Sequence, residues 1–187
     1  MSRWRWAGVS AAISLVLGVI PVAVTSRYTS GSPASRSETA PADDWTSSMA
    51  AVDRALEARD LGLANWRWRE GYGAALRSQR WEAMLAAGET ALRIGRASRT
   101  MAGVQADARQ CFLTALFRAR AQRSLDGILL TADAFGQLGD IAVAQGALRM
   151  ADPLVVATSD GARAWVRLAA ARDRVEARRD TSVLPEE

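Results

Sequence analysis

The chain has 187 residues, of which 49% are apolar, so it is long enough for one ordinary domain with its own core and for terminal appendages. All 24 basic residues are arginines, since the sequence has no lysine and no histidine, and against 20 acidic residues they give a net charge of +4. This composition excludes histidine general bases, histidine metal sites and lysine Schiff bases, and the interspersed acids give no basic stripe for nucleic acid.

The amino-terminal region predicts a membrane anchor. Residues 7–25 carry no charge, and as a helix they would span about 28 Å, close to the hydrocarbon thickness of a bilayer. Arg3 and Arg5 precede this run, and tryptophans beside them suit the headgroup region. The positive-inside rule then places residues 1–6 in the cytoplasm and everything after Tyr28 outside.

A cleaved signal peptide is the alternative interpretation of this segment, because its charged start and apolar middle look alike and Pro21 can end a helix before a cleavage site. The uncharged run is longer than a usual signal-peptide core and no clean Ala-x-Ala follows, which favours the retained anchor. Residues 26–42 are rich in Ser, Thr, Pro and Ala and predict a flexible linker. Both interpretations export the rest of the chain.

Residues 43–179 predict helices only, and residues 180–187 a short tail. Ala, Leu, Arg, Glu and Gln dominate, and strict alternation of apolar and polar residues never persists. Gly95 is expected to end the third helix and Pro153 the sixth, with an extended segment after it. The short connections predict antiparallel hairpins stacked as an all-α solenoid. The expected helices cover about residues 44–59, 63–78, 81–94, 100–121, 124–138, 140–151 and 160–179.

The spacing of apolar residues predicts which side of the last helix faces the core. Trp165, Leu168, Ala169 and Val175 are expected to pack, while the Arg and Asp residues of this helix face water.

Small and aromatic residues near the sixth helix are spaced as in tetratricopeptide repeats, in which two antiparallel helices approach closely at small residues. With Gly139 and Asp140 at the turn, Ala132 and Ala144 fall at the two small positions and Phe135 at the aromatic position. This hairpin resembles one repeat.

A weaker echo of the same twelve-residue spacing joins Gly71 to Ala83, although Ala74 stands where the aromatic residue should be. Residues 43–179 therefore resemble a degenerate tetratricopeptide-like array. An irregular helical bundle is the alternative.

No pattern predicts catalysis, a cofactor or a metal site. Cys111 lies among apolar neighbours, as a buried structural thiol does. The pair Asp43 and Asp44 suits a helix cap. Asp133 and Asp140 flank a turn without the pattern of a calcium-binding loop. The chain is therefore predicted not to be an enzyme.

Two surface features are candidate protein-binding sites. Trp66 and Trp68 face different sides of a helix, so they cannot share one buried seam and one of them is expected at the surface. The alternative is a second packing seam. Arg118, Arg120 and Arg123 are suited to meet carboxylates of a partner; alternatively, they complement the dipole at a helix carboxyl terminus.

The segment QRSLDGILLTADAFGQLGDIAVAQGALRMAD, residues 122–152, is similar to MxaK-type accessory proteins of methylotrophic bacteria, which accompany methanol dehydrogenase. Those are small proteins with one amino-terminal membrane span and a helical periplasmic part, and the chain matches this outline. The resemblance implies a role in maturation of the periplasmic enzyme, including calcium insertion, beside membrane partners with von Willebrand A domains and a MoxR-type ATPase. It assigns no residue a catalytic role.

We therefore expect a non-enzymatic, membrane-anchored periplasmic adaptor that helps to assemble or activate methanol dehydrogenase. Its partners would be other proteins and the membrane, not nucleic acid. A general cell-envelope scaffold is the alternative. A remote alternative is a hydrolase that uses only carboxylates, which would need two of them about 5 to 9.5 Å apart in one concave pocket.

Overall fold

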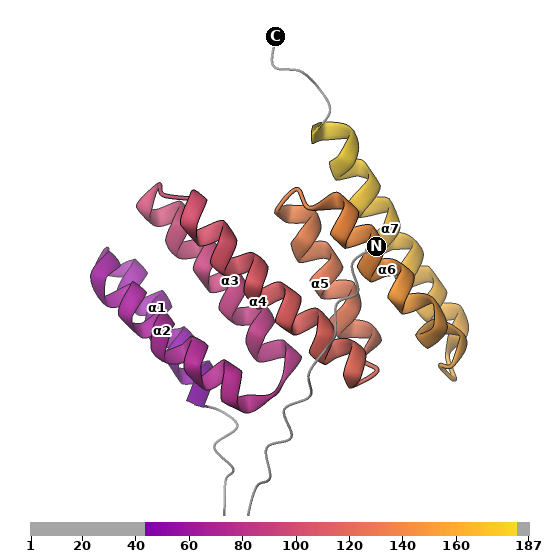
Figure 1. Cartoon of the computed structure of the whole chain (residues 1–187), viewed down its shortest axis with the longest axis horizontal. Helices are drawn as coiled ribbons and strands as arrows, with labels where there is room; N and C mark the ends of the chain where they lie inside the picture. Colours follow the sequence, from indigo (N-terminus) through magenta and orange to yellow (C-terminus); the bar gives the residue numbers. More distant parts are fainter. Residues whose placement is uncertain (1–43, 183–187) are drawn as a thin grey trace, which may run out of the picture. The chain divides into compact units, whose positions relative to one another are not determined.

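The computed structural model describes residues 44–182, which form helices and short connections (Figure 1). This range contains no strand, so the predicted all-α class is confirmed. The predicted anchor at residues 7–25 and linker at 26–42 lie outside the described residues. Within residues 44–182 no helix combines the length and apolar character needed to cross a membrane. The helices are α1 (Asp44–Glu57), α2 (Leu61–Ser78), α3 (Trp81–Ser98), α4 (Ala102–Ala121), α5 (Leu125–Gln137), α6 (Ile141–Val156) and α7 (Gly161–Ser182).

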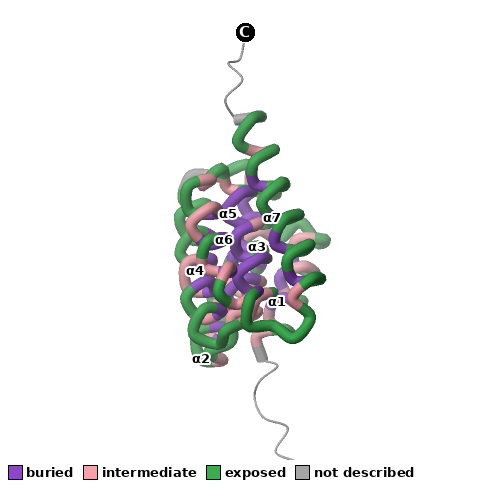
Figure 2. The backbone as a smooth tube through the Cα atoms, turned by 90° about the vertical axis from the view of Figure 1, so that its right-hand side faces the viewer, coloured by how far each residue is buried: buried purple, intermediate pink, exposed green. Residues whose placement is uncertain are grey.

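The helices stack as antiparallel hairpins in two layers. The pairs α1 with α2, α3 with α4 and α5 with α6 pack most closely, and α7 covers α5 and α6. Helices α1, α3, α5 and α7 each contact the next and form one layer. Figure 2 shows α2 and α4 on one side of the buried residues and α1 and α7 on the other. The predicted arrangement of hairpins is therefore present.

Within residues 44–182, four helix connections share one backbone motif, in which a left-handed residue ends a helix and the next N–H bonds to a carbonyl five residues back. The left-handed residues are Arg59, Arg99, Arg123 and Gly139, with φ of 56°, 55°, 53° and 81°. The bonds run from Asp60 to Ala55 (2.9 Å), Thr100 to Gly95 (3.2 Å), Ser124 to Ala119 (2.9 Å) and Asp140 to Phe135 (3.0 Å). The chain thus reverses direction within two or three residues.

The expectation that Gly95 ends the third helix is wrong. Helix α3 continues to Ser98, and Gly95 is buried inside it. A Cβ at Gly95 would lie 2.8 Å from Cγ1 of Val104 in α4, so the glycine allows close approach of the two helices. The left-handed residue that ends α3 is Arg99.

The expectation that Pro153 ends the sixth helix is also wrong. Helix α6 runs through Pro153 to Val156, so the first part of the segment expected to be extended is helical. A proline inside a helix removes one backbone hydrogen bond. The next turn places Val155 fully in the core and Leu154 against it, and we attribute the continued helix to this burial.

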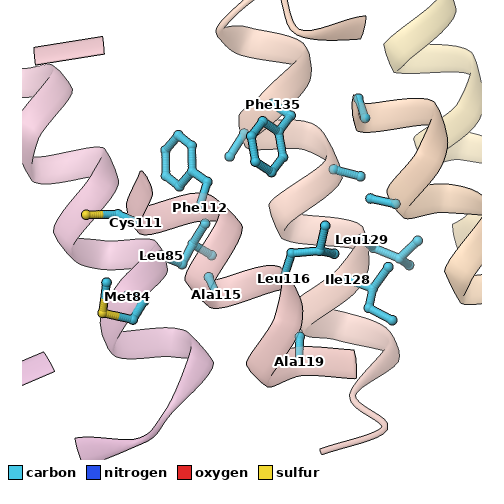
Figure 3. Packing of buried hydrophobic residues seen from close by; sticks show 14 of the residues in the cluster. Met84, Leu85, Cys111, Phe112, Ala115, Leu116, Ala119, Ile128, Leu129 and Phe135 are labelled. Carbon is cyan, nitrogen blue, oxygen red and sulfur yellow. The ribbon is translucent and has the colours of Figure 1, made fainter. Parts of the chain in front are cut away.

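One apolar core extends from α1 to α7. At its centre the rings of Phe112 in α4 and Phe135 in α5 pack edge to face, with centroids 5.9 Å apart (Figure 3). A Cβ at Gly88 in α3 would lie 2.4 Å from Cε1 of Phe112, so only glycine fits against this ring. The residues at predicted repeat positions Ala83, Ala132, Phe135 and Ala144 are fully buried.

Gly71, the other predicted small position, packs in a different place than its spacing suggests. A Cβ there would lie 2.8 Å from Cε of Met49, so Gly71 allows the close approach of α1 and not of α3. Gly71 and Ala83 therefore belong to different hairpins, whereas Ala132 and Ala144 share the α5–α6 hairpin.

The face that α7 buries differs in part from the predicted one. Leu168 and Val175 are buried as expected, but Trp165 is 46% exposed and Ala169 is exposed. The seam consists of Ala164, Leu168, Ala171 and Val175, which recur every three or four residues. The two alanines of this seam alternate with Leu168 and Val175, and the large ring of Trp165 lies outside it.

Candidate functional site

The two candidate tryptophans of α2 have different environments, as their spacing predicts. Trp68 is half-buried: its Nε1 donates a 2.9 Å hydrogen bond to the Ala87 carbonyl in α3, and its ring stacks on Tyr72 with centroids 5.4 Å apart. Trp66 is 49% exposed. Trp68 therefore fastens α2 to α3, and Trp66 is the one that reaches the surface.

The exposed ring of Trp66 is covered in part by its neighbour. The guanidinium carbon of Arg67 lies 4.5 Å from the ring centroid, within reach of a cation–π interaction. Nη1 of Arg67 also bonds to Oε2 of Glu70 at 3.0 Å. These contacts restrict both side chains and produce a paired aromatic and cationic surface.

A polar groove of about 640 Å³ lies between α1 and α2. We call it the arginine groove, because four guanidinium groups and one carboxylate contribute to its wall. The lining residues are Ser47, Ser48, Ala51, Arg54, Arg67, Arg69, Glu70, Gly73 and Arg77.

The close approach of α1 and α2 positions the groove. Met49 inserts against Gly71, and a second small cluster of Val52, Ala55, Ala64 and Ile94 holds the turn end of the hairpin. Asp60 caps α2 by accepting a 2.8 Å bond from the Leu63 N–H. With these apolar faces turned inward, the polar residues of the two helices form the groove outside.

The charges of the groove are not balanced by its own lining. Arg54 and Arg69 are exposed, and their side chains form no ion pair with any residue in 44–182. Arg67 shares the single lining carboxylate, Glu70. An anion entering the groove would therefore meet excess positive charge.

The predicted arginine cluster divides into structural and exposed members. Arg118 donates to the carbonyls of Ala75 (2.9 Å), Leu76 (2.9 Å) and Arg80 (3.1 Å), and burial lowers the pKa of its guanidinium. It thus satisfies carbonyl groups at the carboxyl end of α2. This agrees with the alternative interpretation, in which arginines complement the dipole at a helix carboxyl terminus. Arg120 and Arg123 are exposed at the end of α4.

The arginines of α7 face acids of the neighbouring helices. Oδ1 of Asp133 in α5 accepts bonds from Arg178 (2.8 Å) and Arg174 (3.3 Å). Burial acts to raise the pKa of Asp133, but hydrogen bonds from Arg178, Gln137 and Arg174 lower it on balance. Similar pairs join Arg167 to Asp126 in α5 and Arg172 to Asp152 in α6.

Asp140, the other acid considered for calcium, also binds an arginine. Arg109 in α4 donates to it through two nitrogens at 2.6 and 2.8 Å. Among residues 44–182, no group of three acidic or cysteine side chains is arranged to hold a metal ion.

The single cysteine of the chain is not an activated nucleophile. Cys111 is fully buried, and burial, with a smaller effect of Asp107, raises the pKa of its thiol to about 12. A depression between α6 and α7 does hold two carboxylates, Asp173 and Glu176. Glu176 accepts bonds from Gln145 (3.3 Å) and Arg179 (3.1 Å), so it acts as a contact between these helices.

Comparison of the chain with protein-family models, with curated proteins and with solved structures found no match.

Sequence reasoning identified Trp66 but missed the arginine groove beside it. Arg67, Glu70 and Arg77 recur at helical spacing on one side of α2, a signal that was available. Arg54 comes from α1, and only the packing of the hairpin brings it to the same surface.

Proposed function

We propose that this protein is a non-enzymatic helical-repeat adaptor that docks another protein on the α1–α2 surface. The observation that carries the proposal is that Arg54 and Arg69 of the arginine groove form no ion pair among residues 44–182 and lie near the exposed Trp66. Tryptophan and arginine dominate the binding energy of many protein interfaces. Elsewhere in the domain, on α7, arginines that also reach the surface are paired with acids.

We further propose that the hairpins form a tetratricopeptide-like array. The full burial of Ala132, Phe135 and Ala144 in the α5–α6 hairpin supports this, since these residues hold the small and aromatic positions of such a repeat. Adaptors of this architecture act by shape and surface charge, which agrees with the inert thiol of Cys111.

The proposed client is a periplasmic dehydrogenase, methanol dehydrogenase being the first to test, with an anchor at residues 7–25 holding the adaptor at the inner membrane. The resemblance of residues 122–152 motivates this choice. A general cell-envelope scaffold would use the same docking surface for another client, so the experiment separates the two by the identity of the bound protein.

A site-specific photocross-linker tests the docking surface. The full chain is produced in membranes with a benzophenone amino acid at position 66, together with the methanol dehydrogenase subunits. Position 165 is the matched control, because Trp165 has nearly the same exposure, 46% against 49% for Trp66, but lies on α7. We expect a discrete adduct from position 66 only. Adducts from position 165 alone, or from neither position with any protein, would contradict the proposal.

A further inference from the structure

We infer that the arginine groove binds an acidic peptide segment of the partner protein. The inference rests on the proposed adaptor function and specifies the chemistry of its ligand. Arg54 and Arg69, which form no ion pair among residues 44–182, attract anions, and guanidinium groups match planar carboxylates especially well, because two parallel N–H donors can bond one carboxylate.

The domain's own contacts show this chemistry. Arg109 donates two hydrogen bonds to the carboxylate of Asp140, at 2.6 and 2.8 Å, although the two residues are far apart in the sequence. Asp133 is held by both Arg174 and Arg178. In these places the chain supplies the carboxylate itself. In the groove, Arg54 and Arg69 have no such partner among residues 44–182, and the ligand would supply it.

The dimensions of the groove fit a short segment. From Arg67 to Arg77 helix α2 rises about 15 Å, which an extended peptide covers with about five residues. Arg54 approaches from the opposite wall, on α1. Trp66 lies one turn before Glu70 at one end and offers its exposed ring to an apolar residue beside the acids. The expected ligand is therefore a run of Asp or Glu flanked by one apolar side chain.

A groove favours a peptide over a flat anionic membrane. The arginines line a depression between two helices together with Ser47, Ser48 and Gly73, and so they surround a narrow ligand. A membrane surface is bound best by a broad basic face, but the acids of this chain are interspersed and its net charge is only +4.

The test uses the full chain and a fluorescein-labelled hexaglutamate peptide, measured by fluorescence anisotropy at low salt. The double variant Arg54→Gln with Arg69→Gln removes two groove charges. The double variant Arg149→Gln with Arg163→Gln is its control, since it makes the same change in net charge at exposed arginines of α6 and α7. Circular dichroism checks that both variants remain helical.

We expect the groove variant to bind the peptide about fivefold more weakly and the control within about twofold of the unmodified chain, from the usual strength of exposed ion pairs. Binding should fall with added salt, and hexaglutamine should not bind. No hexaglutamate binding, or equal losses in both variants, would overturn the inference. The inference would also be overturned if binding to phosphatidylglycerol vesicles requires Arg54 and Arg69 but binding to hexaglutamate does not.

The outcome is distinguishable from failure of the adaptor function. If position 66 cross-links a client while hexaglutamate binding is absent, the adaptor proposal stands and the acidic-segment inference fails. If neither experiment gives a signal, both fail.

Discussion

Arginine has different surroundings at the two ends of the domain. On α7 the side chains of Arg167, Arg172 and Arg178 meet aspartates of α5 and α6, so their charges join helices. In the α1–α2 hairpin Arg54 and Arg69 line a groove with one carboxylate, which is already bonded to Arg67. The same residue type is structural where a neighbouring helix supplies an acid, and we propose that Arg54 and Arg69, which form no ion pair among residues 44–182, bind a partner instead.

The two ends also differ in how their helices pack. Helix α7 buries a seam of Ala164, Leu168, Ala171 and Val175 and has ion pairs on its flanks. In the amino-terminal hairpin, α1 and α2 pack closely where Met49 lies against Gly71. Changes to the charges should therefore affect stability at one end and binding at the other.

The largest expected effect is on the α7 seam. Leu168 is fully buried, and Leu168→Ala should lower the free energy of unfolding by about 3 kcal/mol through lost burial and a new cavity. Urea unfolding followed by circular dichroism measures this. Trp165→Ala, the neighbouring exposed position, is the control and should cost much less. An equal cost for both would show that the seam is misplaced.

A second change removes Asp133, the aspartate of α5 that pairs with two arginines of α7. Asp133→Ala should lower the free energy of unfolding by about 1 to 2 kcal/mol, because Arg178 and Arg174 lose this acceptor. The side chain of Asp133 is only 23% exposed. The same urea experiment applies. Glu70→Ala in the groove is the comparison and should cost less, since Glu70 is 43% exposed and bonds one arginine. A larger loss for Glu70→Ala would reverse the contrast between the two ends.

The same aspartate predicts a pH dependence. The pKa of Asp133 is lower in the folded protein than its unfolded value of about 3.9, so its contribution is complete above that value and is lost as the pH falls through the folded-state pKa. The stability difference between the unmodified chain and Asp133→Asn should therefore shrink below about pH 4. A difference that stays constant down to pH 2 would show that Asp133 is not ionised in its pairs.

The smallest expected effects concern the turns. Arg59→Gly in the α1–α2 turn should raise stability by up to about 1 kcal/mol, because φ of 56° suits glycine better than arginine. Gly139→Ala in the α5–α6 turn, with φ of 81°, should lower it by a similar amount. Thermal unfolding distinguishes these signs. If Arg59→Gly destabilises, the arginine side chain contributes contacts that offset its strained backbone.

The fold could be predicted from the sequence to the extent that apolar spacing determines it. The spacing of Leu168 and Val175 predicts a helix face that packs as expected. Gly95 gave a wrong boundary because glycine can end a helix or allow close packing within it, and Pro153 gave one because burial of the next turn favours the continued helix. Only the partner helix decides between these roles.

The candidate site was predictable in part for a related reason. The positions of Trp66 and Trp68 on one helix are enough to show that they face different sides. The turn residues Arg59, Arg99 and Arg123 carry no glycine signal, and the groove depends on Arg54 of α1 lying across from arginines of α2. Interactions between helices are not visible in local periodicity.

A charge-reversal experiment with two readouts tests the central claim most directly. Arg54→Glu with Arg69→Glu in the groove is compared with Arg167→Glu with Arg174→Glu on α7, and both hexaglutamate affinity and the urea midpoint are measured. We predict that the groove variant binds hexaglutamate more weakly and keeps its urea midpoint. The α7 variant should unfold at a lower urea concentration and, while folded, bind hexaglutamate as before. A groove variant that unfolds more readily but binds as before, or an α7 variant that loses binding without losing stability, would contradict the assignment of the two arginine sets.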